Sequence, residues 1–216
     1  MLTPSFESQA SLPVKSRSWL NAYQRANQYF SYFPFHLIFG SWYGDVNCLF
    51  EQDDIQPGHG YIIAANHQSR IDPFMIMGAI PLRFWPNISM VHFMTANIFF
   101  KFFPLKLFLQ SFGCFPVKQI DARPAGLDFS RVVLGRAESV FIFPEGRRTR
   151  PNQLPAKRGI EEIAHLEKIV VIPVRIRWTT SSLFRRKADI TIGRPLDAKA
   201  MSAQDILDHI YALPLG

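Results

Sequence analysis

The sequence predicts a single α/β domain with a mainly parallel or mixed central sheet flanked by helices, preceded by an aromatic helical arm. Short apolar runs alternate with helical segments along the chain, which is the pattern of α/β proteins. Hydrophobic residues make up 48% of the sequence and charged residues 19%. This composition is typical of a globular protein and argues against disorder. A chain of 216 residues is long enough to bury one substantial core.

The predicted arm lies in a run without Asp, Glu, Lys or Arg between Arg25 and Asp45. Its length approaches the ~20 residues that span a bilayer, but polar side chains and Pro34 interrupt it. Because aromatic rings with polar tips prefer the lipid–water interface, we expect one or two helices over residues 19–43 that lie on or dip into a membrane. The alternative is an aromatic helix that covers the protein core. Residues 1–50 are assigned to a flexible leader and this membrane-associating arm, and 51–216 to the α/β domain.

The elements of the α/β domain follow from apolar runs bounded by turn residues. Asp72 and Pro73 indicate an N-cap and a first helical position, and Pro116 marks an edge strand because proline cannot donate to a ladder. The predicted strands occupy residues 61–65, 88–93, 114–118, 139–143, 169–178 and 188–196. The predicted helices occupy residues 73–80, 94–113 with an interruption at Pro104, 123–135, 159–168 and 202–213.

Charge and cysteine usage limit the function classes. Lys and Arg outnumber Asp and Glu by 24 to 17, giving a net charge of +7, which favours an anionic partner. The 20 Phe residues favour lipid over nucleic acid, for which no recognition motif is evident. Cys48 and Cys114 make no disulfide framework, as is typical of a reducing compartment. The N-terminus lacks a signal-peptide pattern, so we expect a peripheral or monotopic protein on the cytoplasmic face of a membrane.

Two turns that follow apolar strands carry candidate chemistry. In NHQSRID (residues 66–72), His67 follows a strand and Asp72 opens a helix, so the carboxylate could orient the imidazole as a general base. The structural alternatives are a helix cap and a strand-end histidine without catalytic function. In FPEGRRTR (residues 143–150), a glycine turn carries arginines whose forks match phosphate oxygens; the alternative is a solvated basic loop. The histidines show no metal-ligand spacing.

These two turns together resemble the glycerolipid acyltransferases of the lysophosphatidate acyltransferase type. NHQSRID resembles the N-H-x-x-x-x-D signature of that family, and FPEGRRT is similar to its F-P-E-G-T-R-S block. GCFPV (residues 113–117), AKRGI (residues 156–160) and VVIPVRI (residues 170–176) resemble three further family elements. The ordered set covers roughly residues 61–178, over half of the chain.

The resemblance implies an acyltransferase that moves a fatty acyl group from acyl-CoA or acyl carrier protein to a lysophospholipid, in phospholipid biosynthesis. It makes His67 the general base and Asp72 its orienting partner, with no metal, bound cofactor or covalent acyl-enzyme. The expected acceptor and phosphate residues are Glu145, Gly146, Arg147, Arg148, Lys118 and Lys157.

Two departures from the family pattern bear on the acceptor. Arg147 replaces the usual Thr of the glycine–arginine block, and Gln119 stands where the second block usually ends in arginine. Lys118, Arg123 or Arg147 would have to replace that arginine, or the acceptor differs. Lysophosphatidate is the expected acceptor. The alternatives are another lysolipid, such as an amino-acid lipid, and a non-catalytic lipid-binding membrane module.

Overall fold

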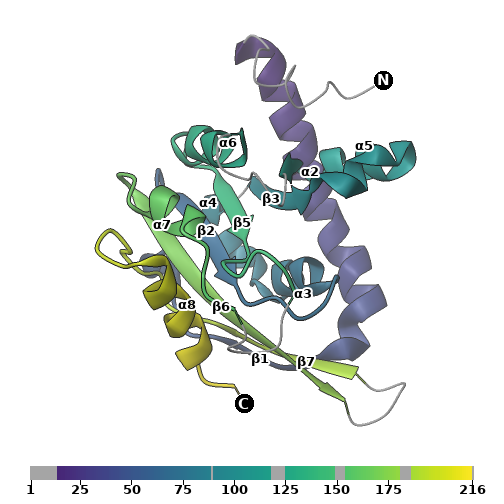
Figure 1. Cartoon of the computed structure of the whole chain (residues 1–216). Coiled ribbons are helices and arrows are strands. Elements are labelled where there is room, and N and C mark those ends of the chain that lie inside the picture. The colour runs from purple at the N-terminus through teal and green to yellow at the C-terminus, as the bar shows by residue number, and fades with distance from the viewer. Residues whose placement is uncertain (1–13, 89, 118–124, 149–153, 181–185, 216) are drawn as a thin grey trace.

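The computed structural model of the chain describes residues 14–88, 90–117, 125–148, 154–180 and 186–215, and these residues form one seven-stranded sheet with the order β1-β7-β6-β2-β5-β3-β4 (Figure 1). The strands are β1 (Tyr43–Cys48), β2 (Gly60–Ala65), β3 (Val91–Ala96), β4 (Cys114–Val117), β5 (Ser139–Ile142), β6 (Ile169–Thr180) and β7 (Arg186–Ile192). β6 and β7 pair antiparallel, whereas the other neighbours pair parallel. The predicted α/β fold with a mixed sheet is confirmed, and β4 is an edge strand as Pro116 indicated.

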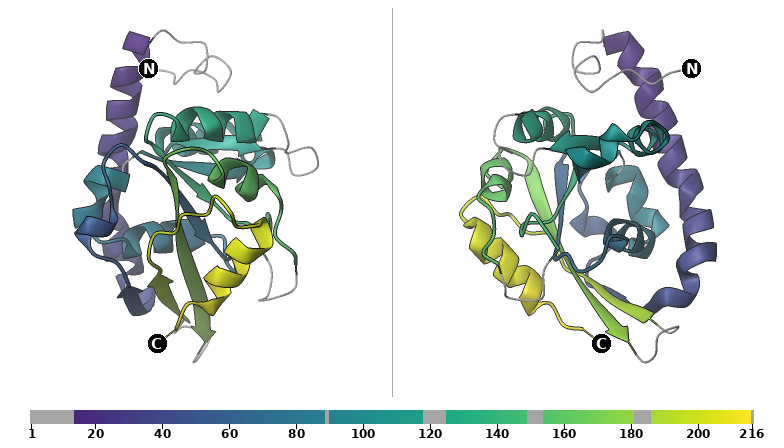
Figure 2. Two further views of the ribbon diagram at one scale, coloured as in Figure 1. Left: turned by 90° about the vertical axis from the view of Figure 1, so that its left-hand side faces the viewer. Right: turned by 45° about the vertical axis from the view of Figure 1, so that its right-hand side comes forward.

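Helices cover both faces of the sheet (Figure 2). α2 (Val14–Phe39), α3 (Asp72–Ala79) and α4 (Trp85–Ile88) lie on one face, and α6 (Ala125–Leu134), α7 (Gly159–Ala164) and α8 (Ala203–Ala212) lie on the other. Successive residues of β2 alternate between the two apolar cores, with Ile63 packing towards α3 and Ile62 towards α6 and α8. This alternation follows the period of two that side chains have along a strand. The full burial of β2 explains why it reads as a continuous apolar run.

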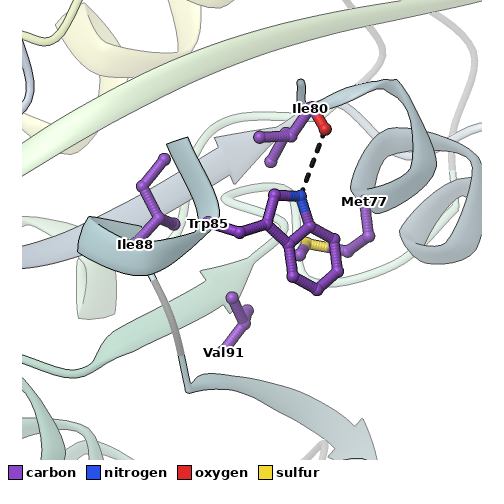
Figure 3. A pocket seen from close by; sticks show the side chains of 5 residues that line it. All are labelled: Met77, Ile80, Trp85, Ile88 and Val91. Atoms are coloured by element: carbon purple, nitrogen blue, oxygen red, sulfur yellow. Dashed lines mark hydrogen bonds between the residues drawn. The ribbon is translucent and has the colours of Figure 1, made fainter. Parts of the chain in front are cut away.

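A buried tryptophan, Trp85, packs in the core on the α3 side of the sheet. The indole N–H of Trp85 donates to the carbonyl of Ile80 at 3.1 Å, and the ring packs among Met77, Ile88 and Val91 (Figure 3). Tyr29 and Tyr32 of α2 contact the same ring at centroid distances of 5.3 and 5.8 Å. Part of the aromatic content of α2 is therefore used in packing against the domain.

Side-chain amides attach α2 to the end of the sheet. Gln28 donates to the carbonyl of Val91 at 2.7 Å and accepts from the N–H of the same residue at 3.1 Å, so its amide pairs with the backbone as a neighbouring strand would. Gln24 donates to the carbonyl of Gln110 at 2.8 Å, and Asn27 donates to that of Ser111 at 3.2 Å. These three residues lie on one side of a helix, at spacings of three and four.

The arm, expected as one or two helices, is a single helix that continues through Pro34. Several predicted boundaries of other elements are wrong. β1 was not predicted, because it is a short edge strand whose central residues are exposed and show no apolar alternation. The predicted strand 88–93 is β3 at Val91–Ala96, preceded by the short helix α4.

The other differences concern helices and strand ends. The predicted helix 94–113 consists of the end of β3, the 3-10 helix η4 (Asn97–Lys101) and α5 (Phe103–Ser111), with Pro104 in the first turn of α5, where a missing N–H costs little. α7 ends four residues before the predicted Lys168, which has a positive φ of 57°. β7 spans Arg186–Ile192 rather than 188–196.

Candidate active site

The two loops singled out in the sequence leave the same edge of the sheet. β2 and β5 are parallel neighbours, with Ala64 opposite Ile142, so their carboxyl ends lie side by side. Residues 66–71 follow β2 and lead into α3, and residues 143–148 follow β5. Ligands of open α/β sheets bind beyond these strand ends. The fold therefore brings His67 and the glycine–arginine block to one place.

His67 and Asp72 form a hydrogen-bonded pair. His67 Nδ1 lies 3.0 Å from Asp72 Oδ2, which also accepts the backbone N–H groups of Gln68 at 2.6 Å and Ser69 at 2.7 Å. Since this oxygen faces two obligate donors, it acts as an acceptor, and the proton between the two side chains belongs to Nδ1. No hydrogen bond from a described residue occupies His67 Nε2, so that nitrogen is left as the basic one.

Burial separates the two members of the pair. The Asp72 side chain has no exposed area, whereas that of His67 is 17% exposed. The imidazole stacks on Phe143, with ring centroids 3.8 Å apart and planes at 16°. The histidine side chain is thus partly exposed, while its partner is fully buried. Ile71, not the predicted Asp72, is the N-cap of α3; the Asp72 carboxylate points back to the loop instead of capping its own helix.

The end of β6 holds the His67 loop in place. The Asn66 amide exchanges two hydrogen bonds with the backbone of Ile176, at 2.9 and 2.8 Å. Gln68 Oε1 accepts the backbone N–H of Trp178 at 3.1 Å, and the Trp178 indole N–H donates to Asp72 Oδ1 at 2.8 Å. The loop is therefore fixed from both sides of His67.

Glu145 lies inside the protein, with its side chain directed at the histidine backbone. The residue is 1% exposed. Its Oε2 accepts the backbone N–H of His67 at 3.0 Å, and its Oε1 accepts the hydroxyl of Tyr211 at 2.7 Å. The carboxylate predicted to shape the acceptor site thus links the β5 loop to His67 and to α8.

Gly146 makes the turn that carries the basic residues. Its φ is +71°, and a Cβ added there would lie 2.5 Å from Cε of Lys157. The Lys157 backbone N–H donates to Pro144 at 2.9 Å. Glycine is therefore required both for the backbone conformation and for the passage of the Lys157 side chain.

The positive charges of this site face solvent. Arg147, Arg148 and Lys157 are exposed, and none of them forms an ion pair with another described residue. Lys118 lies outside the described residues, as do Gln119 and Arg123. Three unpaired cations beside the His67 loop favour an anionic ligand.

The cysteines offer no reactive thiolate. Burial raises the pKa of Cys114 to about 12, and burial also raises the pKa of Cys48, so both are protonated at neutral pH. Within the ranges that the structure describes, no group of three or more His, Cys, Asp or Glu side chains could hold a metal ion. Among the same residues, no helix has the length and apolar character needed to cross a bilayer.

Comparison with known proteins assigns the family. Residues 48–177 match the family described as Acyltransferase, a stretch that includes both loops. The chain belongs to the acyltransferase family. It is similar to 1-acyl-sn-glycerol-3-phosphate acyltransferases of Cocos nucifera (28% identity, 61% of this chain) and Saccharomyces cerevisiae (30% identity, 56% of this chain). The matched stretches span 43% and 40% of the length of these relatives.

A solved member of the family shares the fold. The crystal structure of the 1-acyl-sn-glycerophosphate acyltransferase PlsC from Thermotoga maritima aligns with a TM-score of 0.56 and 17% identity, over 94% of this chain and 81% of that one. The resemblance stated from the two loops is thereby confirmed at the level of family and fold.

Three residues that contact the candidate site were given no role in the sequence analysis. Phe143 and Trp178 lie within stretches examined in the sequence, but a ring that stacks on His67 or donates to Asp72 cannot be told from a core aromatic. Tyr211 comes from the C-terminal helix, where an amphipathic pattern predicts packing alone. Contacts over 66 and 106 residues of sequence separation leave no local signal.

Proposed function

We propose that the protein transfers a fatty acyl group from the thioester of acyl-CoA or acyl carrier protein to the free hydroxyl of a lysophospholipid, with lysophosphatidate as the acceptor. The observation that carries this proposal is the His67–Asp72 pair, in which the carboxylate holds the proton on Nδ1 and leaves Nε2 as the basic nitrogen of a partly exposed side chain. Family membership and the named activity of the similar proteins support it.

The proposed reaction is direct transfer. His67 Nε2 removes the proton of the acceptor hydroxyl, and the oxygen attacks the thioester carbonyl to give a tetrahedral intermediate. The C–S bond then breaks, and the imidazolium returns its proton to the departing thiolate. The Asp72 carboxylate stabilises the imidazolium during these steps. The thiols of Cys48 and Cys114, both protonated at neutral pH by burial, offer no nucleophile for an acyl-enzyme.

The basic loop is the proposed acceptor site. Arg147, Arg148 and Lys157 present exposed positive charge beside the His67 loop, and arginine forks bind phosphate oxygens in pairs. Gly146 allows Lys157 to cross the turn. Glu145 keeps the histidine backbone in place instead of contacting the acceptor, since its carboxylate is buried between His67 and Tyr211.

We propose that exposed apolar residues of α2 and of the stretch around α5 attach the protein to a membrane, on its cytoplasmic face. Phe30, Phe33 and Leu37 of α2 are 78%, 78% and 88% exposed. α5 lies beside α2 (Figures 1 and 2), and the adjoining stretch adds Ile98, Phe102 and Phe103. We call these six residues the apolar face. Exposed apolar surface of this kind favours insertion among lipid headgroups and acyl chains.

The test is acylation in detergent micelles. Palmitoyl-CoA and palmitoyl-acyl carrier protein are each offered against a panel of lysolipids, including lysophosphatidate and an amino-acid lysolipid, and the products are identified by mass spectrometry. The proposal predicts phosphatidate formed with at least one donor. Transfer to another lysolipid alone would keep the chemistry and change the acceptor. A folded, liposome-bound protein that acylates nothing would be a lipid-binding module.

A further inference from the structure

Trp178 forms a hydrogen bond to the His67–Asp72 pair, although it lies outside the two loops that follow β2 and β5. It lies near the end of β6, and its indole N–H donates to Asp72 Oδ1 at 2.8 Å. We propose that Trp178 is a positioning residue that sets the plane of the Asp72 carboxylate and thereby the orientation of His67. This inference rests on the proposed function, because it names a residue that the same general-base step requires.

The two oxygens of Asp72 have different partners. His67 Nδ1 and the backbone N–H groups of Gln68 and Ser69 all contact Oδ2, whereas the Trp178 indole contacts Oδ1. The terminal torsion of an aspartate is broad and roughly two-fold, so the hydrogen bonds to its oxygens decide the angle at which the carboxylate is held. The three bonds to Oδ2 restrain one oxygen, and the indole N–H restrains the other, so both sets of bonds together hold the carboxylate against rotation. Since the side chain is fully buried, bulk solvent does not supply a donor to Oδ1.

Trp178 is itself held at its backbone and at its ring. The Trp178 backbone N–H donates to the Gln68 side chain at 3.1 Å, which joins the strand to the loop that carries His67. Trp42, just beyond the end of α2, meets the Trp178 ring edge-on at a centroid distance of 6.3 Å and an angle of 80°. The donor thus has a defined direction before any substrate binds, as a positioning residue requires.

Trp85 provides a matched comparison. Its indole N–H also donates to an oxygen within the protein, the carbonyl of Ile80 at 3.1 Å (Figure 3), and its side chain is more buried than that of Trp178. It contacts neither His67 nor Asp72. Replacement by Phe therefore removes an indole hydrogen bond in both cases, but only at Trp178 does that bond end on the catalytic carboxylate.

The first test is spectroscopic and needs no turnover. The full chain in detergent is labelled with 15N in Trp and His, and the Trp signals are assigned from Trp-to-Phe variants. Asp72→Asn should move the indole N–H signal of Trp178 and leave that of Trp85 in place. Trp178→Phe should shift or broaden the Nδ1–H signal of His67, and Trp85→Phe should leave it unchanged. If the Nδ1–H signal of His67 keeps its position and width in Trp178→Phe, the inference is overturned.

The second test is kinetic. A hydrogen bond to a buried carboxylate is worth roughly tenfold to a hundredfold in rate if it is needed in the transition state. Trp178→Phe should lower kcat by about tenfold or more, with KM for donor and acceptor unchanged within about twofold, and Trp85→Phe should keep the wild-type kcat. An unchanged kcat in Trp178→Phe, or an equal loss in both variants, overturns the inference. An inactive wild-type protein would instead refute the proposed function, and the His67 signal would still decide whether Trp178 positions the pair.

Discussion

The carboxylate of Glu145 lies inside the protein, between the N–H of His67 and the hydroxyl of Tyr211. A buried carboxylate needs such donors, because an unpaired charge in the interior is costly. Its position makes it a link between α8 and the histidine. The candidate site is therefore joined by hydrogen bonds to a residue far away in the sequence, Tyr211.

Tyr211→Phe tests this link. Loss of the hydroxyl should cost about 1 kcal/mol of unfolding free energy and lower kcat several-fold, because the His67 backbone loses part of its support. Tyr61→Phe is the control, since its hydroxyl donates to the carbonyl of Gln56 at 2.7 Å, away from the site. Equal activity of the two variants would show that Glu145 holds His67 without Tyr211.

Gly146→Ala and Gly58→Ala separate backbone strain from the position of Lys157. Both glycines have positive φ, +71° and +81°, but a Cβ at Gly58 meets nothing within 4 Å, whereas one at Gly146 meets the Lys157 side chain. Each change should cost about 1–2 kcal/mol of unfolding free energy. Only Gly146→Ala should raise KM for a phosphate-bearing acceptor, because it displaces Lys157. The same KM in both variants would remove Lys157 from the acceptor site.

Among the elements, α2 has two different sides. Its inner side packs aromatic rings on Trp85 and presents three amides to the backbone of β3 and α5, and its outer side carries part of the apolar face. The inner side thus covers the core, and the outer side leaves apolar side chains exposed for the proposed interface helix.

Gln28→Ala should loosen α2 from the sheet. The amide satisfies both backbone groups of Val91, and leaving them unpaired should cost about 2–3 kcal/mol of unfolding free energy. Thermal unfolding and limited proteolysis measure the effect. Arg25→Ala, an exposed change on the same helix, should be neutral; equal stability of the two variants would contradict the role given to Gln28.

For the molecule as a whole, the Cys114 thiol should lower the stability at alkaline pH. Burial raises the pKa of Cys114 from 9.0 to about 12, so between these values the folded protein holds a proton that the unfolded chain has lost. Unfolding then becomes more favourable as pH rises. The free energy of unfolding should therefore fall between pH 9 and 12, and less steeply in Cys114→Ala. Identical slopes for the variant and the wild type would contradict this.

The proposed membrane attachment is also tested at the scale of the whole molecule. Leu37→Asp should reduce co-sedimentation with anionic liposomes by roughly tenfold. It removes a leucine side chain whose burial among lipids would contribute about 2 kcal/mol to the free energy of binding. Val132→Asp makes the same change at an exposed valine of α6, on the other face of the sheet, and should leave binding intact. Equal binding by both variants would argue against the apolar face.

The sequence predicted those parts of the protein that depend on local patterns. β2, β5 and β6 were recognisable because buried strands are continuous apolar runs, and His67 and Asp72 because a loop of a few residues brings them together. β1 escaped prediction because it is exposed in its centre. The arm was predicted as one or two helices, and the choice of a single helix through Pro34 was left open because tertiary contacts hold that helix. Trp178 and Tyr211 reach the site through the sheet order, which no local pattern records.

The most direct test of the central claim compares acyl transfer by the wild-type protein, His67→Ala and His165→Ala in the same micelles. His165 is an exposed histidine at the end of α7, so its replacement controls for the loss of an imidazole. The account predicts that His67→Ala lowers kcat by about 10²–10⁴ while the protein stays folded, and that His165→Ala keeps the wild-type rate. A folded His67→Ala variant that transfers acyl groups at the wild-type rate would contradict it.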